Sequence, residues 1–332
     1  MSPRVSVIIP TYNRADLLPR AVQSVLDQDF TDLELLVVDD GSTDHTGEIV
    51  QSMRDQDSRV WYLRIAENRG IGYARNFGLR NAKGDFIAWI DSDDVWLPGT
   101  LQEKVRILET YADIDILFTD FLNINLINDT QANAFIAVEV ALRMLETAQL
   151  EEDLFYVVSG MEFALLRKMI VQLGTAIFRA GLIKIIGSFN TILSGPEDFE
   201  FVWRAAVKDC RFAFMCTASQ IRYVDSASFT SNKATSLYKT IQALQICRST
   251  GETLQRYDLR KPIREAQLRN WRNLIWVYGK DGARLEAIQA YRQSKVAVGF
   301  SLRSLVFYLA ALLGPRCISL FQAGLRLRNL GN

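Results

Sequence analysis

The 332-residue sequence predicts an α/β fold, a mostly parallel sheet flanked by helices, with a helical C-terminal extension. Two observations support this. Over residues 1–112, four short apolar runs alternate with four segments of helical spacing. Beyond residue 236 the apolar spacing is helical throughout and basic residues accumulate. Strands that alternate with helices need crossover connections, which favour parallel neighbours and cover both faces of a sheet.

The four strand–helix units follow one another closely. The predicted strands are residues 5–9, 33–38, 60–65 and 85–90, and the helices after them are residues 15–26, 46–53, 73–82 and 100–111. The first helix shows the expected spacing, because Leu18, Val22 and Val25 fall on one face. Residues 128–173 are predicted to be largely helical, and a break at Gly195-Pro196 precedes another helix over residues 199–207.

Charge is balanced overall but unevenly distributed. Lysine plus arginine and aspartate plus glutamate both number 38, so net charge gives no argument for a nucleic-acid partner. From Leu254 to the end there are 14 basic and 4 acidic residues, which leaves 24 basic and 34 acidic residues in the first 253. The sequence therefore predicts an acidic body and a basic tail.

Three further features indicate a cytoplasmic protein. The four cysteines show neither metal-ligand spacing nor a secreted disulfide framework. The N-terminus runs directly into a strand-like segment without a signal peptide. The longest apolar run, Leu305 to Leu313, is about half the length that a bilayer-spanning helix needs.

Polar residues gather where each predicted strand ends. The four segments are Pro10-Thr11-Tyr12-Asn13, Asp39-Asp40-Gly41-Ser42, Glu67-Asn68-Arg69-Gly70 and Asp91-Ser92-Asp93-Asp94. Because ligands of parallel sheets bind beyond the carboxyl ends of the strands, these loops are predicted to converge on one rim.

The acidic loops each allow two interpretations. Asp91-x-Asp93 after a buried strand suits a hard divalent cation, Mg²⁺ or Mn²⁺, whose shell a phosphate would complete; it could instead be a turn that caps the next helix. Asp39 to Asp44 could likewise be only a strand-to-helix connection with an N-cap. Glu197-Asp198 starts a helix, where the dipole favours ionised carboxylates, but such pairs are often simply solvated.

The only histidine, His45, lies in a polar loop and is expected to be exposed, which argues against a Ser-His-Asp triad.

Together these segments resemble glycosyltransferase family 2, the inverting enzymes of the GT-A fold. The resemblance spans residues 4–210 and rests on "VSVIIPTYNRADLLPRAVQSVLDQDF", "LELLVVDDGSTD", "ENRGIGYARNFGLRNAKGDFIAWIDSDD" and "GPEDFEFVWR", in the family's order. It implies a Rossmann-like, GT-A type sheet.

The resemblance also implies a role for each matching residue. Asp198 matches the catalytic base, and Asp93 matches the ligand of a divalent cation, Mn²⁺ or Mg²⁺. The residues implied to bind the nucleotide sugar are Pro10, Tyr12, Asp40, Asn68, Arg75 and Asp91. For Arg75 a structural ion pair is the alternative.

Three functional parts are predicted on this basis. Residues 1–112 are the nucleotide-sugar-binding half, residues 113–235 the acceptor-binding half with the base, and residues 236–332 a basic helical extension. The implied reaction is metal-dependent transfer of a sugar from a nucleotide-diphosphate sugar to a hydroxyl of a saccharide or lipid-linked acceptor, in cell-surface polysaccharide synthesis.

The tail adds a prediction about the membrane. An apolar stripe runs from Phe300 to Leu313 and on to Leu327, beside Arg303, Arg316 and Arg326. Such a basic amphipathic stripe is typical of a peripheral membrane contact, with packing on the body or on a partner chain as the alternative. Gln267 to Trp271 is similar to the QxxRW motif of processive synthases, but Asn270 stands where that motif has arginine. Transfer of one or a few sugars is therefore favoured.

Two other classes compete with this interpretation. A Rossmann-type dehydrogenase would need its glycine motif after the first strand, whereas Gly70-x-Gly72 follows the third. A non-catalytic nucleotide-sugar-binding protein would not need carboxylates at all four positions 40, 91, 93 and 198. The residues thus favour an enzyme.

Overall fold

The computed structural model describes residues 2–126, 130–224 and 232–313. It divides into two compact units, residues 1–228 and residues 229–332, and each is considered by itself. The predicted boundary between residues 112 and 113 lies inside the first unit. The division of that unit into a nucleotide-sugar-binding half and an acceptor-binding half stays a prediction.

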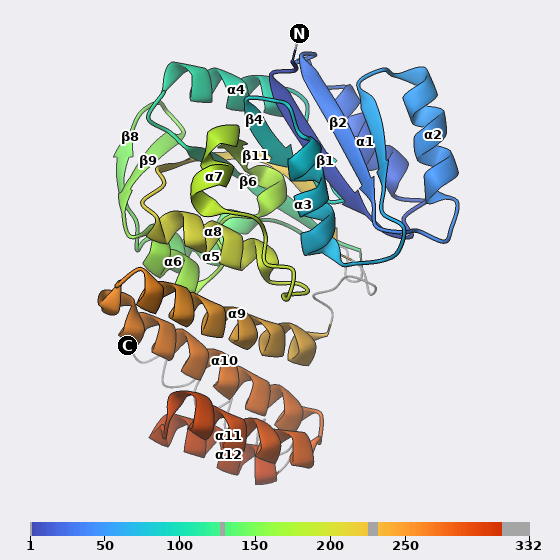
Figure 1. Cartoon of the computed structure of the whole chain (residues 1–332). Helices are drawn as coiled ribbons and strands as arrows, with labels where there is room; N and C mark the ends of the chain where they lie inside the picture. Colours follow the sequence, from blue (N-terminus) through green and yellow to red (C-terminus); the bar gives the residue numbers. More distant parts are fainter. Residues whose placement is uncertain (1, 127–129, 225–231, 314–332) are drawn as a thin grey trace. The chain divides into compact units, whose positions relative to one another are not determined.

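The first unit is built on one sheet of eleven strands (Figure 1). The strands are β1 (Val5–Thr11), β2 (Leu33–Asp39), β3 (Val60–Arg64), β4 (Phe86–Trp89), β5 (Val95–Trp96), β6 (Ile116–Asn125), β7 (Thr130–Asn133), β8 (Glu146–Gln149), β9 (Leu154–Ser159), β10 (Ile177–Arg179) and β11 (Phe212–Val224). Their order is β3-β2-β1-β4-β10-β6-β11-β9-β8, with β5 on β11 and β7 on β6.

The strand order reverses at β1, and this reversal positions the site. β1 pairs in parallel with β2 on one side and with β4 on the other, with Thr11 opposite Asp39 and Ile8 opposite Trp89. Connections leave β1 and β4 in opposite directions, which opens a crevice at the carboxyl ends of the strands. The predicted α/β fold with a mostly parallel sheet is confirmed.

The four predicted strand–helix units are also confirmed. Their helices are α1 (Leu18–Leu26), α2 (Thr46–Gln56), α3 (Ile71–Asn81) and α4 (Thr100–Thr110). Leu18, Val22 and Val25 of α1 join the buried core that covers one face of the sheet, together with Leu101 and Val105 of α4. Helical periodicity is a strong predictor here because one face of each helix is buried.

An aromatic cluster lies beneath α8 (Glu197–Val207), the helix that carries the predicted base. Trp89 of β4 contacts Phe178, Phe189 and Phe201 edge to face, with centroids 5.2, 5.6 and 6.1 Å away. Phe189 and Phe201 stack on each other at 4.0 Å. These rings hold α8 and the segment before it against the strand that leads into the acidic loop.

The prediction of a largely helical stretch over residues 128–173 is wrong in part. α5 (Ala134–Leu142) and α6 (Met161–Arg167) are helices, but β7, β8 and β9 lie between and around them. β8 is exposed along its whole length and pairs only with β9, which in turn joins β11. An exposed edge strand has no apolar alternation, so its pairing is not visible in the local sequence.

The second unit is helical, as predicted, and consists of α9 (Lys233–Thr253), α10 (Arg260–Lys280), α11 (Arg284–Val298) and α12 (Leu302–Leu313). Gln267 and Trp271 of α10 are both buried within this unit. Ile275, Tyr291 and Ala311 belong to the same core as Trp271. Across the described part of the chain, every helix is too short or too polar to cross a bilayer.

Lys104 is an exception to the apolar core of the first unit. Its side chain on α4 is 1% exposed, and within the described residues its Nζ makes no hydrogen bond. The ammonium lies 5.5 Å from the centroid of the Trp96 ring. Burial disfavours the charged form and lowers the pKa of Lys104 to about 7.

This lysine should make stability depend on pH. An unfolded lysine keeps a pKa near 10.5, so between about pH 7 and that value the unfolded state binds more protons and stability rises with pH. The slope approaches about 1.4 kcal/mol per pH unit. Lys104→Met should abolish this slope and raise the melting temperature at pH 7, as measured by denaturation at several pH values. Lys83→Met, which removes an exposed lysine over Trp61, is the control. Equal slopes in wild type and Lys104→Met would contradict this account.

Candidate active site

Asp40 connects the loops that follow three strands. Its backbone N–H donates to Thr11 O after β1, at 2.9 Å. Its carboxylate accepts from the backbone N–H groups of Arg69 at 2.9 Å and Gly70 at 2.7 Å. Burial raises the pKa of Asp40, and these two donors oppose the rise. The predicted nucleotide-binding aspartate therefore also shapes the rim.

The turn after Asp40 requires glycine. Gly41 has a φ of 77°, and a Cβ there would lie 2.7 Å from the backbone carbon of Glu67. Asp39 stabilises the same turn, because it accepts from Ser42 N–H at 2.8 Å and from the Tyr62 hydroxyl at 2.7 Å. The loops after β2 and β3 are thus in direct backbone contact, as convergence on one rim requires.

The three carboxylates of the acidic loop have different surroundings. Asp94 is buried, and its Oδ2 accepts from the amides of Gln220 and, at 3.3 Å, Gln172. Burial and the neighbouring Asp91 and Asp93 raise the pKa of Asp94 well above its usual range. Asp94 is therefore a structural residue, whereas Asp91 and Asp93 are only partly buried.

Asp93 lies in a partly buried position among arginines. Burial and the nearby Asp91 raise the pKa of Asp93, while Arg14 and Arg222 lower it. Arg20 donates to the Asp93 backbone carbonyl at 2.9 Å. The loop therefore combines acidic groups, which attract a cation, with basic groups, which attract phosphate.

Arg75 is buried between two carboxylates. Its side chain is 3% exposed, and it donates to Asp91 at 3.0 Å and to Glu197 at 2.5 Å. Glu197 is itself buried and accepts a further bond from Gly195 N–H at 2.7 Å. The possibility that Glu197 is simply solvated is therefore wrong, and the ion-pair alternative for Arg75 is present in the structure.

Asp198 follows Glu197 in the first turn of α8. Asp198 is partly buried. Burial and the adjacent Glu197 raise the pKa of Asp198 to about 7, while Arg75 lowers it. The helix dipole favours the ionised form of this carboxylate, but desolvation and the adjacent like charge outweigh the dipole.

The remaining predicted residues lie along the same strand ends. Tyr12 is 43% exposed just beyond β1, whereas Pro10 is buried within that strand. Asn68 is exposed in the loop that Asp40 holds. His45 is exposed, as predicted, beside Glu48. A ligand could thus reach Tyr12 and Asn68 directly, while Pro10 supports the strand.

The residues present fit a cation that shares its shell with a ligand. No group of three or more aspartate, glutamate, histidine or cysteine side chains within the described residues is arranged to hold a metal by itself. The glutamines engage Asp94 and Arg75 pairs with Asp91, which leaves Asp93 as the carboxylate of this loop for a cation. Mg²⁺ and Mn²⁺ commonly bind through one or two carboxylates with substrate phosphates completing the shell.

Residues that the sequence did not single out also shape the site. Asn76 of α3 donates to Phe189 O at 2.9 Å and accepts from Phe189 N–H at 2.8 Å. Together with the Arg75–Glu197 pair, this bond connects α3 to the segment before α8. The only sequence indication was that Asn76 follows Arg75 in the family-like segment.

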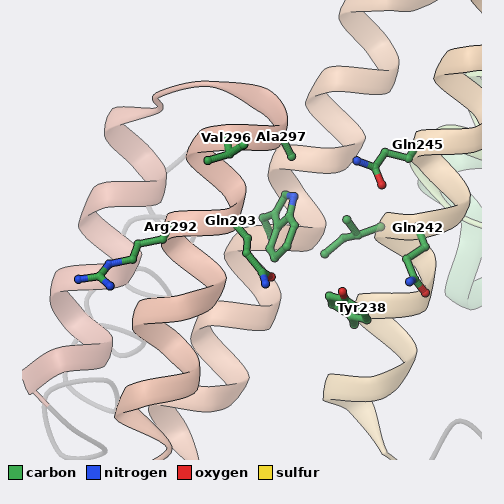
Figure 2. Close-up of a pocket in the computed structure, with 9 residues that line it drawn as sticks. Tyr238, Gln242, Gln245, Arg292, Gln293, Val296 and Ala297 are labelled. Carbon is green, nitrogen blue, oxygen red and sulfur yellow. The ribbon is translucent and has the colours of Figure 1, made fainter.

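The helical unit contains a separate pocket of about 410 Å³ between α9, α10 and α11 (Figure 2). Its lining includes Tyr238, Gln242, Gln245 and Gln293, with Arg292 as the charged group. No carboxylate lines it, so it offers neither a general base nor a hard cation ligand.

The sheet with its reversal at β1, the acidic loop and the rim define a GT-A type α/β protein. The chain belongs to glycosyl transferase family 2, whose profile matches residues 6–174. This finding removes the dehydrogenase alternative.

Curated relatives match over part of their length. The GalNAc(5)-diNAcBac-PP-undecaprenol beta-1,3-glucosyltransferase of Campylobacter jejuni is 40% identical over 116 residues, 34% of this chain and 37% of that protein. The putative teichuronic acid biosynthesis glycosyltransferase TuaG of Bacillus subtilis is 41% identical over 106 residues, 32% of this chain and 42% of that protein. The chain thus matches less than half the length of these relatives.

Two solved structures share the fold over most of the chain. S. aureus TarS 1-349 in complex with UDP-GlcNAc has a TM-score of 0.55 and 22% identity, covering 90% of this chain and 91% of that one. The mannosyltransferase PcManGT from Pyrobaculum calidifontis, in complex with GDP-Man and Mn²⁺, has a TM-score of 0.57 and 18% identity, covering 96% and 85%.

Proposed function

We propose that this protein is a metal-dependent inverting glycosyltransferase. It transfers a sugar from a nucleotide-diphosphate sugar to a hydroxyl of a saccharide or lipid-linked acceptor in cell-surface polysaccharide synthesis. Family membership supports transfer, and relatives with polysaccharide names support the setting. The bound UDP-GlcNAc and GDP-Man of the two similar structures support the donor class.

The observation that carries the proposal is the position of Asp198 in the first turn of α8, which the Asp91–Arg75–Glu197 ion pairs connect to the acidic loop. Its pKa, raised to about 7, supports this role. A general base works best when its pKa is close to the working pH. Asp198 would remove the proton of the acceptor hydroxyl as that oxygen attacks the anomeric carbon from the face opposite the diphosphate. Direct displacement inverts that carbon.

The donor would bind at the rim. Tyr12, Asp40 and Asn68 would contact its nucleoside, and Asp91 would lie near the ribose. Asp93 would hold Mn²⁺ or Mg²⁺, which when bound offsets charge on the diphosphate. Arg75 would orient Asp91 through their ion pair.

Asp198→Asn tests the base. The variant should lower kcat by about 100-fold or more while donor affinity stays within about twofold, because the lost group acts only on the acceptor. Steady-state transfer assays and donor titrations would measure the two effects. Asp209→Asn, in the exposed turn after the end of α8, is the control. Near-normal turnover in Asp198→Asn would exclude this role.

Asp93→Ala tests the cation. If Asp93 and the diphosphate share a cation, nucleotide-diphosphate binding should weaken at least about tenfold in EDTA and in Asp93→Ala, while nucleoside binding changes little. Calorimetric titration with UDP and GDP, with and without Mn²⁺, would measure this. Asp113→Ala removes a surface carboxylate that is 86% exposed and is the control. Affinity that is independent of metal would remove the assignment.

We further propose that α12 contacts an anionic membrane surface. Leu302, Val306, Leu309 and Leu313 are exposed along one side of α12, between 39% and 68%. The opposite side packs inside the unit, where Tyr308 stacks on Tyr291 at 4.3 Å. The apolar side is therefore a separate surface and not part of the helical core.

The basic residues near α12 support an anionic bilayer as the partner of this apolar surface. After Glu286 the sequence contains no acidic residue, and its six basic residues are Arg292, Lys295, Arg303, Arg316, Arg326 and Arg328. The last three, and the continuation of the stripe to Leu327, lie outside the described residues. Each basic residue near such a surface contributes about 1 kcal/mol.

Vesicle sedimentation tests this contact. The full-length protein should bind phosphatidylglycerol-containing vesicles at low salt and bind phosphatidylcholine vesicles weakly. Val306→Ser/Leu309→Ser should lose most of the binding, whereas Ile136→Ser/Ile192→Ser removes comparable exposed apolar groups elsewhere and should not. If the wild-type protein does not bind the anionic vesicles, the membrane contact is excluded. The apolar side of α12 is then better explained as a protein contact, and a soluble acceptor becomes the better proposal.

A further inference from the structure

A continuous chain of charges connects the acidic loop to α8. Asp91 at the end of β4 pairs with Arg75 of α3 at 3.0 Å, and Arg75 pairs with Glu197 of α8 at 2.5 Å. Arg75 and Glu197 are 3% and 2% exposed, so water screens their interaction poorly. Asp198 is the next residue after the last member of this chain.

The charge on each of these three residues affects the pKa of Asp198. Three charged groups on three elements affect its pKa: Glu197 on α8 and Asp91 after β4 raise it, and Arg75 on α3 lowers it. The two carboxylates disfavour its ionised form, and the guanidinium favours it. Glu197 is the residue adjacent to Asp198, and Arg75 is fixed between Glu197 and Asp91, so neither Glu197 nor Arg75 can move without breaking a buried pair.

We propose that Glu197 and Arg75 are positioning residues that jointly set the protonation of Asp198, with Arg75 joining Glu197 to Asp91 of the acidic loop. This proposal rests on the function proposed above for Asp198. Glu197 keeps the carboxylate from being permanently ionised, and Arg75 keeps it from being permanently protonated. Neither residue contacts the acceptor in this account.

The two residues should therefore act in opposite directions. Glu197→Gln removes a negative charge beside Asp198 and should lower its titration midpoint by about one pH unit or more. Arg75→Gln removes the positive charge and should raise the midpoint by a similar amount. A purely structural role would perturb both variants without opposite signs.

The titration can be observed without any donor or acceptor. In full-length protein labelled with ¹³Cγ-aspartate, the Asp198 carboxyl resonance is assigned by its loss in Asp198→Asn and followed from pH 4 to 9. The wild-type midpoint is expected near 7. Where transfer can be assayed, the acidic limb of the kcat profile should move with the same sign in each variant.

Glu200→Gln is the matched control. Glu200 is also buried on α8 and pairs with an arginine, Arg204, at 2.8 Å. Glu200→Gln removes the same type of buried ion pair but should leave the titration midpoint of Asp198 unchanged. Arg75→Lys keeps the charge and should restore most of the midpoint that Arg75→Gln shifts.

Glu197→Gln is the decisive variant, because Arg75 keeps Asp91 as a partner and no buried cation is left alone. A midpoint unchanged in Glu197→Gln, or moved equally in Glu200→Gln, would overturn the proposal. These results would not bear on whether Asp198 is the base, which Asp198→Asn turnover decides separately.

Discussion

A buried guanidinium must be surrounded by anionic partners, and Arg75 obtains them from two distant parts of the chain. One partner, Asp91, ends the strand-to-loop segment after β4, and the other, Glu197, begins α8. Breaking a buried pair costs roughly 3–5 kcal/mol. This constraint holds the acidic loop and α8 together, and the bonds of Asn76 to Phe189 reinforce it. The rest of the candidate site depends on that connection.

The acidic loop illustrates how position distinguishes chemically identical groups. Asp94 faces inward to two glutamine amides, Asp91 faces Arg75, and Asp93 lies among more distant arginines. Three carboxylates in four positions would repel one another in a uniform environment. Because burial disfavours the charged form of Asp94 and Arg75 pairs with Asp91, the repulsion is reduced before any cation binds. The loop can then use its remaining negative charge for a ligand.

Sequence patterns predicted the features that depend on local spacing. The four strand–helix units and the rim loops follow from periodicity and from the polar residues at strand ends, and the structure agrees. The strands over residues 128–173 were missed because β8 is an exposed edge whose partner is chosen by tertiary pairing. The burial of Glu197 was not predicted, because its partner Arg75 is 122 residues away. Nothing in the neighbourhood of a glutamate indicates that it will be buried.

Asp198 shows which physical effect prevails when several compete at one carboxylate. A helix N-terminus favours an ionised carboxylate by up to about 1 kcal/mol at ordinary exposure. The rise of the pKa from 3.8 to about 7 corresponds to roughly 4 kcal/mol in the other direction, so burial beside Glu197 prevails. Holding a carboxylate in this state costs folding free energy, and the aromatic packing of Trp89, Phe189 and Phe201 beneath the same helix offsets such a cost. The aromatic cluster and the Asp91–Arg75–Glu197 ion pairs therefore belong to one arrangement. In it, apolar packing holds α8 in a position where the carboxylates of its first turn are largely removed from water.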